Sequence, residues 1–178
     1  CRAAQALAPL LPSGHVCLGA LLREEGDHRA ALGEFQIASN LNLADGDAVR
    51  GIARAHADLG NPLAAESTYL TRAMREEFES KDRRWLGAFY ADRGRFEESA
   101  DQFEIAIELE PENGLGYRAR GGVLIQLGDY GAAIEMLSEA RRLRPRDGGV
   151  RSNLGMALFY ERAYAEAVVE LEAGAELE

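Results

Sequence analysis

The chain has 178 residues, of which 47% are hydrophobic, and its formal net charge is −10. It is long enough to bury a sizeable core, and none of its apolar runs approaches the roughly 18 residues of a membrane-spanning helix. The acidic balance argues against a general nucleic-acid-binding protein, because phosphate binding usually requires a basic surface.

The N-terminal segment, residues 2–8, has the pattern of the second helix of a hairpin. Ala4 and Pro9 stand where such a helix has its last small residue and its closing proline. We therefore expect the chain to begin inside a longer protein. The alternative is that Cys1 is the lipid-modified first residue of a bacterial lipoprotein, so the cellular compartment stays open. Two cysteines make no disulfide framework, and Cys17 is expected to be a small packed or half-exposed thiol.

The next segment, residues 12–45, has the spacing of a complete helical hairpin. Apolar residues three and four apart predict helices over about 13–25 and 29–42, on either side of a turn at Gly26-Asp27. Leu43 stands where a closing proline is expected, so the second helix should end less sharply.

A second hairpin is predicted over residues 46–79. Asn61-Pro62 indicates an N-cap followed by proline at the first helical position, where the missing N–H costs nothing. Arg72 occupies a position where a small residue is expected, and residues 74–84 contain neither glycine nor proline. The second helix of this hairpin is therefore expected to run long, with an irregular junction to the next hairpin.

Three further hairpins follow without a gap, over residues 80–113, 114–147 and 148–178. The first two of these are regular and are closed by Pro111 and Pro145. The last has Arg162 in place of the turn glycine and Gly174 in place of a small alanine.

All five hairpins keep one register of 34 residues. Turn glycines recur at Gly26, Gly60, Gly94 and Gly128. Small residues recur in the first helix at Gly19, Ala53, Gly87, Gly121 and Gly155. Small residues recur in the second helix at Ala31, Ala65, Ser99, Ala133 and Ala167. Large residues, which we expect to fill the space between the paired helices, recur at Phe35, Tyr69, Phe103, Leu137 and Leu171.

This register resembles the tetratricopeptide repeat, a helical hairpin of about 34 residues. Residues 114–147 carry its order most completely: an aromatic, a small and a large residue, then the turn glycine, then alanine, a large apolar residue, alanine and proline. The resemblance implies an all-α fold, a right-handed superhelical α-solenoid in which the hairpins form a single array over residues 1–178. The alternative is an ordinary helical bundle with accidental spacing.

Residues that carry chemistry are sparse. His15, His28 and His56 lie in separate hairpins, and His15 and Cys17 lack the further partners of a metal site, so each histidine is expected at the surface or in helix packing. We predict no catalytic residue, no metal site and no cofactor. A solvated helix face is expected for an acidic run in the last helix, Glu166, Glu170, Glu172, Glu176 and Glu178.

One set of basic residues stands above this background. In arrays that resemble this one, the first helix of each hairpin lines a concave groove, and the residue after the position of Tyr117 points into it. In the five hairpins that position holds Val16, Arg50, Arg84, Arg118 and Ser152. We call Arg50, Arg84 and Arg118 the arginine series; Arg54 and Lys81 are expected on the same face.

The arginine series predicts a carboxylate- or phosphate-bearing partner segment, because the guanidinium fork suits both groups. The alternative is that these are ordinary solvated arginines, paired with Asp47, Asp58 or Asp92.

Toward the C-terminus the same surface is expected to become more apolar. The candidate contacts there are Ile125, Asn153, Met156, Phe159 and Tyr160. A basic middle and an apolar end would suit an extended peptide with acidic and hydrophobic anchors; alternatively, Phe159 packs against a further hairpin. The clamp with which relatives hold C-terminal carboxylates is not expected, because Trp85, Leu115 and Ala119 stand at clamp positions.

Two classes of function are compatible with this pattern. The first is a non-catalytic scaffold that binds a partner protein or peptide in its concave groove. The second is the substrate-recognition or regulatory arm of a larger enzyme, and the flanking sequence would separate the two. Apolar residues at the ends of the array, including Val168 and Leu171, make self-association a further expectation.

Overall fold

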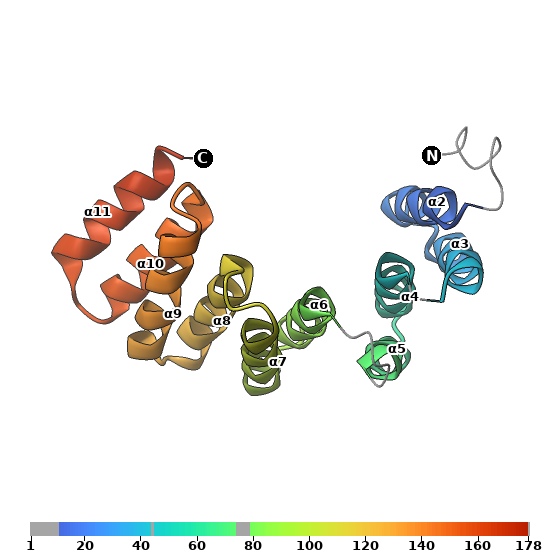
Figure 1. Ribbon diagram of the computed structural model, residues 1–178, viewed down its shortest axis with the longest axis horizontal. Coiled ribbons are helices and arrows are strands. Elements are labelled where there is room, and N and C mark those ends of the chain that lie inside the picture. Colours follow the sequence, from blue (N-terminus) through green and yellow to red (C-terminus); the bar gives the residue numbers. More distant parts are fainter. Residues whose placement is uncertain (1–10, 44, 74–78, 178) are drawn as a thin grey trace. The chain divides into compact units, whose positions relative to one another are not determined.

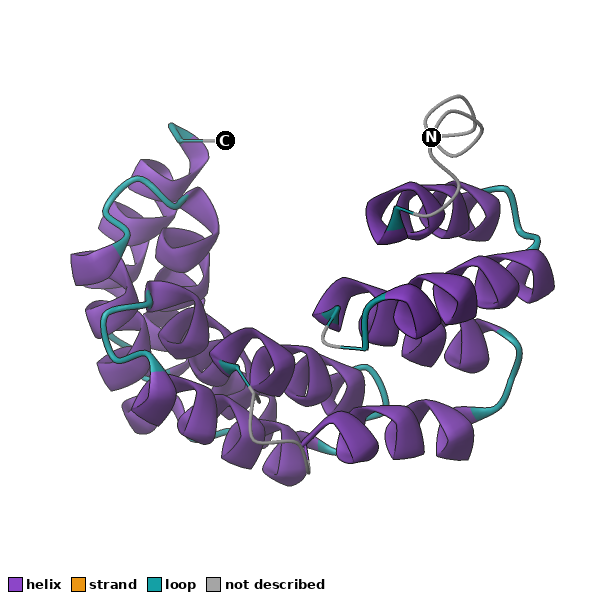
Figure 2. Cartoon of the chain, turned by 45° about the vertical axis from the view of Figure 1, so that its right-hand side comes forward, coloured by secondary structure: helices purple, strands orange, loops and turns teal. Residues whose placement is uncertain are grey.

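The computed structural model describes residues 11–43, 45–73 and 79–177, and every regular element in these ranges is an α-helix (Figures 1 and 2). The helices are α2 (Pro12–Glu24), α3 (His28–Leu41), α4 (Gly46–Asp58), α5 (Pro62–Ala73), α6 (Ser80–Ala91), α7 (Phe96–Leu109), α8 (Gly114–Leu127), α9 (Tyr130–Leu143), α10 (Gly148–Tyr160) and α11 (Tyr164–Ala175). The predicted all-α class of tandem hairpins is confirmed. The helix expected over residues 2–8 and the expected extension beyond α5 lie outside the described residues.

The described helices fall into two compact units, α2 to α5 and α6 to α11, with the boundary between residues 78 and 79. In the first unit consecutive helices pack together and α2 also contacts α4. In the second unit consecutive helices again pack together, and α8 also contacts α6 and α10. Within each unit, the first helices of the hairpins therefore form one layer and the second helices form another. A single array over the whole chain stays a prediction.

Helix starts are specified by short polar side chains. Asp27, Asp45, Asn113, Asp129 and Asp147 each accept a hydrogen bond from a backbone N–H in the first turn of the helix that follows. Such a cap stabilises a helix by about 1 kcal/mol, because these N–H groups have no partner within the helix. Asp45, Asn113 and Asp147 share one register position and Asp27 and Asp129 share another, whereas α2, α7 and α11 begin without a side-chain cap.

The turn inside each hairpin needs a left-handed residue. Gly26, Gly60, Gly94 and Gly128 have φ between 71° and 86°, as glycine at a helix end permits. In the last hairpin Arg162 takes this place with φ 66°, so the turn is kept without glycine.

Small residues of the first helix lie against large residues of the second, as the register predicts. A Cβ built on Gly87 would lie 2.7 Å from Cε1 of Phe103, and one built on Gly121 would lie 2.5 Å from Cγ of Leu137. Ala133 is fully buried in the same contact region. The helices can approach this closely only because the first helix carries no side chain there.

Two predictions about individual side chains are wrong. Glu170 is not on a solvated face: it is buried, and its carboxylate binds Arg141 of α9 and Arg151 of α10. Cys17 is not a thiol: it is disulfide-bonded, and the other cysteine of the chain, Cys1, lies outside the described residues.

His15 is a helix-packing residue, one of the two environments predicted for it. The ring is buried, and its Nδ1 lies 2.7 Å from Oε2 of Glu34 on the paired helix α3. Among the described residues, no helix is long and apolar enough to cross a membrane.

Candidate functional site

The layer of first helices in the second unit carries six of the eight predicted contact residues. We call the outward side chains of α6, α8 and α10 the first-helix surface. The six are Lys81 and Arg84 on α6, Arg118 on α8, and Asn153, Met156 and Tyr160 on α10. The other two, Arg50 and Arg54, lie on α4 of the first unit.

Arg118 is fixed in place by Asp147, the N-cap residue of the following first helix, α10. Its Nη1 donates to both carboxylate oxygens of Asp147, at 3.1 Å each. The guanidinium also lies beside Gly149, where a Cβ would come within 3.4 Å of Cζ. The Arg118 side chain remains 43% exposed whereas that of Asp147 is 10% exposed. Since both hydrogen bonds use Nη1, the Nε and Nη2 donors have no partner among the described residues.

Asp147 is held by more than this one arginine. Its Oδ2 accepts from Nε of Arg144 at 2.9 Å, and its Oδ1 caps α10 by accepting from the N–H of Val150 at 3.2 Å. Burial alone would raise the pKa of Asp147, but the hydrogen bond from Arg144 and the charge and hydrogen bond of Arg118 outweigh it, so the pKa lies below its ordinary value. Asp147 is therefore an anion that orders Arg118 and starts α10 with the same side chain.

Arg84 occupies the equivalent position one hairpin earlier, and it is more enclosed. Its Nη1 donates to the Ser80 hydroxyl at 2.8 Å and lies 3.3 Å from Oε2 of Glu110. The side chain is only 18% exposed. Nearby, Nζ of Lys81 lies 3.0 Å from Oε2 of Glu79 and 5.9 Å from the centre of the Trp85 ring. Arg84 is thus less accessible to a partner than Arg118, whereas the side chain of Lys81 is as exposed as that of Arg118, at 43%.

The member of the arginine series in the first unit, Arg50, has a partner on its own helix. Arg50 pairs with Asp47, three residues earlier, at 3.0 Å, which is one of the pairings expected if these are ordinary solvated arginines. Arg54, one turn later, is exposed. Asp58, the second acid considered as a partner, pairs instead with Arg23 at 3.4 Å.

The apolar end of the first-helix surface is smaller than predicted. Ile125 does not reach the surface: it is 7% exposed and belongs to the core formed with Leu154 and Leu158. Met156 is exposed. Asn153 faces α8, since a Cβ on Gly122 would lie 3.6 Å from its Nδ2.

Tyr160 belongs to an exposed aromatic cluster at the turn ends of two hairpins. Its ring stacks on Tyr130 at the start of α9 with centroids 4.9 Å apart, and Phe159 meets it edge-on at 5.8 Å. Phe159 in turn contacts Tyr164 at 5.6 Å. Phe159 was expected either in the groove or against a further hairpin, whereas in the structure its described ring contacts are within the last hairpin.

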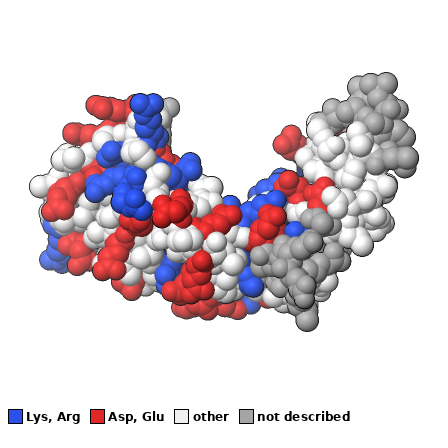
Figure 3. All heavy atoms as spheres, viewed as in Figure 1, with Lys and Arg blue, Asp and Glu red and all other residues white. Residues whose placement is uncertain are grey.

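Sequence reasoning missed Asp147 and Glu110 as partners of the arginine series. Both acids lie near the turn into the following helix, 29 and 26 residues after the arginine that each binds. An acid at such a turn is a sequence signal for a helix cap, and the arginine register alone did not indicate that the two groups meet. On the face seen in Figure 3, charges of both signs are mixed over α6 to α11.

Comparisons with known proteins agree with the 34-residue register and the helical fold. A family model described as tetratricopeptide repeat matches residues 86–147 and residues 119–176. A small glutamine-rich tetratricopeptide repeat-containing protein 2 from Mycosarcoma maydis is 34% identical over 73 residues, which are 41% of this chain and 21% of that protein. BBSome complex member BBS4 from Xenopus tropicalis is 28% identical over 127 residues, 71% of this chain and 24% of that protein.

Among solved structures, yeast Tom70 is similar with a TM-score of 0.90 and 17% sequence identity, covering 99% of this chain and 38% of that one. At this identity the likeness concerns the fold. The chain spans about a fifth to a quarter of the length of the two curated relatives.

Proposed function

Because this chain belongs to the tetratricopeptide repeat family, whose members mediate protein–protein interaction, we propose that it is a non-catalytic scaffold whose first-helix surface binds an acidic, extended segment of a partner protein. Arg118 is the principal anchor for an acidic side chain of that segment. Met156 and Tyr160, on the neighbouring helix α10, receive an apolar side chain, and Asn153 lies between them and α8.

The observation that carries the proposal is the state of Arg118. Asp147 holds its guanidinium in one place, beside Gly149, while nearly half of the side chain stays exposed. A fixed arginine loses little conformational freedom on binding, and its Nε and Nη2 donors can meet a carboxylate side by side. Arg84 is more enclosed and already serves Ser80 and Glu110, so its contribution to binding should be smaller.

Selection from a displayed library of extended peptides on the immobilised chain tests the proposal. We expect enrichment of peptides that combine Asp or Glu with an aromatic or large aliphatic residue. The dissociation constant of an enriched peptide is then measured for the parent chain and for an Arg84→Ala, Arg118→Ala double variant at two salt concentrations. Loss of two charge-assisted contacts should weaken binding about tenfold or more, and the weakened binding should depend less on salt.

Arg142→Ala is the matched control. Arg142 is exposed and lies on α9, in the layer of second helices, where it pairs with Glu139 of its own helix. Removing it changes the net charge by the same step as one anchor substitution but leaves the first-helix surface intact. Equal losses from Arg118→Ala and Arg142→Ala would mean that overall charge drives binding. Unchanged affinity in the double variant with an intact fold would place the binding site elsewhere.

A further inference from the structure

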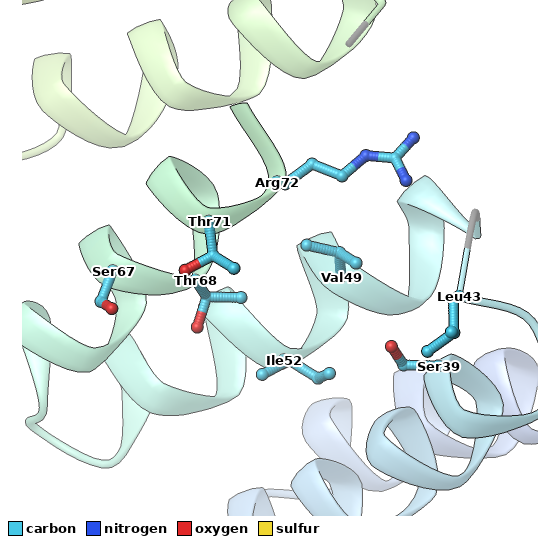
Figure 4. Close-up of a pocket in the computed structure, with 8 residues that line it drawn as sticks. All are labelled: Ser39, Leu43, Val49, Ile52, Ser67, Thr68, Thr71 and Arg72. Atoms are coloured by element: carbon cyan, nitrogen blue, oxygen red, sulfur yellow. The ribbon is translucent and has the colours of Figure 1, made fainter. Parts of the chain in front are cut away.

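Clefts in the layer of second helices recur with the register. In the first unit one such cleft lies between α3 and α5, and Ser39 and Ile52 are among the residues that line it (Figure 4). In the second unit one lies between α9 and α11, and Arg141 and Leu154 line it at the same register positions. The repeat itself therefore produces these clefts. A site for a particular ligand is indicated instead by residues that depart from the register.

The last turn of α10 departs from the register in the size of its side chains. The other hairpins have Arg23, Ala57, Ala91 and Ile125 where α10 has Phe159. They have Glu24, Asp58, Asp92 and Gln126 where α10 has Tyr160. Phe159 is 54% exposed and Tyr160 is 49% exposed. Since the other hairpins form without an aromatic ring at either position, the fold does not require these two rings.

Phe159 and Tyr160 join two further rings in one contiguous patch. We call Tyr130, Phe159, Tyr160 and Tyr164 the aromatic cluster. Tyr130 stacks on Tyr160, with ring centroids 4.9 Å apart. Phe159 meets Tyr160 at an interplanar angle of 75° and Tyr164, which is 54% exposed, at 61°. A contiguous exposed patch of this kind marks an interaction surface, and rings that already pack against one another lose little freedom when a ligand binds.

Three of the four rings carry a hydroxyl group that is available to a ligand. Within the described residues, the hydroxyls of Tyr130, Tyr160 and Tyr164 make no hydrogen bond. A phenol hydroxyl can donate a hydrogen bond as well as accept one. The aromatic cluster therefore combines apolar ring surface with donors for carbonyl groups. This combination suits a partner segment whose backbone carbonyls are not already hydrogen-bonded.

The surroundings of the aromatic cluster are acidic. The charged residues next to the four rings in the sequence, or next but one, are Asp129, Glu161, Arg162 and Glu166, and all of them are exposed. Three are carboxylates and one is a cation. The excess of negative charge favours a ligand that carries lysine or arginine beside its apolar part.

We propose that the aromatic cluster binds a proline-rich segment of a partner protein, with a basic residue beside the prolines. Such a segment forms a polyproline II helix, whose backbone carbonyls have no internal hydrogen bonds and can accept from the tyrosine hydroxyls. Its pyrrolidine rings pack on the aromatic rings, and because the helix is already formed, little conformational entropy is lost on binding. The aromatic cluster adjoins the first-helix surface along α10, but binding there does not require the anchor Arg118.

The test is a titration of the ¹⁵N-labelled full chain with four short acetylated peptides, followed through its backbone amide resonances. The first peptide has a run of prolines followed by two arginines. The second has alanines in place of the prolines, the third has alternating leucine and glycine in their place, and the fourth has prolines followed by two glutamates.

We expect the proline–arginine peptide to shift the amides of Tyr130, Tyr160 and Tyr164 saturably, with a dissociation constant of about millimolar order. The alanine and leucine–glycine peptides should bind at least about tenfold more weakly, because neither is held in the polyproline II conformation. The proline–glutamate peptide should bind a few-fold more weakly, because exposed charges interact only weakly.

Tyr164→Ala is the principal variant, because Tyr164 lies on α11, outside the first-helix surface. Loss of the ring should weaken binding of the proline–arginine peptide about tenfold, while the amide spectrum shows that the fold is kept. Tyr164→Phe keeps the ring and should bind at most a few-fold more weakly. Leu109→Ala is the matched control. Leu109 is 51% exposed at the end of α7, so this variant loses exposed apolar surface elsewhere in the second unit and should bind as the parent does.

Three results would overturn the proposal. One is equal binding of the proline–arginine and alanine–arginine peptides, which would mean that charge alone attracts them. Another is equal binding of the leucine–glycine peptide, which would make the aromatic cluster merely apolar. The third is unaltered binding by a folded Tyr164→Ala variant, which would place the ligand away from the aromatic cluster.

Discussion

Gly121 shows at the scale of one residue what holds a hairpin together. A Cβ at this position would lie 2.5 Å from Cγ of Leu137, a side chain that is fully buried. Gly121→Ala should therefore lower the free energy of unfolding by about 1–3 kcal/mol, the usual range for overpacking, although alanine is the better helix former. Urea denaturation of the parent and variant measures the difference.

Gly131→Ala is the control for that substitution. Gly131 lies in α9 of the same hairpin, and a Cβ there would meet nothing within 4 Å. The free energy of unfolding of the Gly131→Ala variant should equal that of the parent or exceed it by up to about 1 kcal/mol. If both variants were equally stable, the close contact between Gly121 and Leu137 would not limit how closely the two helices pack.

Asp147 gives a pH-dependent prediction. Its pKa is lowered in the folded chain, so its contribution to stability is present above the ordinary carboxyl pKa and is lost as the pH falls through the folded value. Asp147→Asn keeps an N-cap side chain but removes the charge that Arg118 and Arg144 bind. The free energy of unfolding of the variant should be lower than that of the parent at pH 7. This difference should become smaller below about pH 4. Denaturation of both proteins at pH 7 and at pH 3 measures the difference in the free energy of unfolding at each pH. Equal differences at the two pH values would contradict a role of the charge.

At this scale the sequence predicted side-chain size better than side-chain partners. Size repeats with the register, so a single hairpin indicates where Gly121, Ala133 and Leu137 meet. The acids bound by the arginine series do not share a register position: Arg84 binds Glu110, 26 residues later, whereas Arg118 binds Asp147, 29 residues later. Which acid a long arginine side chain reaches depends on its rotamer and on the geometry of the turn. The spacing of residues in the sequence predicts neither.

Among elements, α11 departs furthest from what its sequence suggests. Its acidic residues alternate with exposed apolar ones, and only Glu170 turns inward. There it meets Arg141 and Arg151 from the two preceding helices, so that one carboxylate ties three helices together. The pattern of charges along α11 could not reveal this, because the two arginines lie on other elements.

Glu170→Ala tests the contribution of this junction. Both arginines would lose a charge-assisted hydrogen bond, although each is exposed enough to regain some water, so the expected loss of stability is about 2–3 kcal/mol. Glu166→Ala, at an exposed position one turn earlier on α11, should change stability by no more than about 0.5 kcal/mol. Denaturant midpoints of the two variants decide the matter, and equal midpoints would show that the buried carboxylate adds nothing to the packing of α11.

At the scale of the whole molecule, the helices of the described residues and their register followed from the repeat, while the division into two compact units did not. The boundary between residues 78 and 79 coincides with the stretch after Arg72 that lacks the glycine and proline signals of the other junctions. The absence of glycine and proline indicated that this junction differs from the others. It did not indicate how, because a longer helix and an irregular connection would both lack these residues.

The division leads to the last prediction. In a repeat protein each hairpin contacts only its neighbours, so stability is nearly a sum of terms for hairpins and for adjacent interfaces. The second unit contains three complete hairpins and its own buried clusters, one around Leu137 and Leu154 and one around Phe103 and Val123. A fragment of residues 79–178 should therefore fold alone, with a helical circular dichroism spectrum and a cooperative thermal transition. Within this fragment Gly121→Ala should cost the same free energy as in the full chain, because the contact with Leu137 is internal to the unit. A fragment that is unfolded at room temperature, or one in which Gly121→Ala no longer matters, would mean that the second unit depends on the first for its packing.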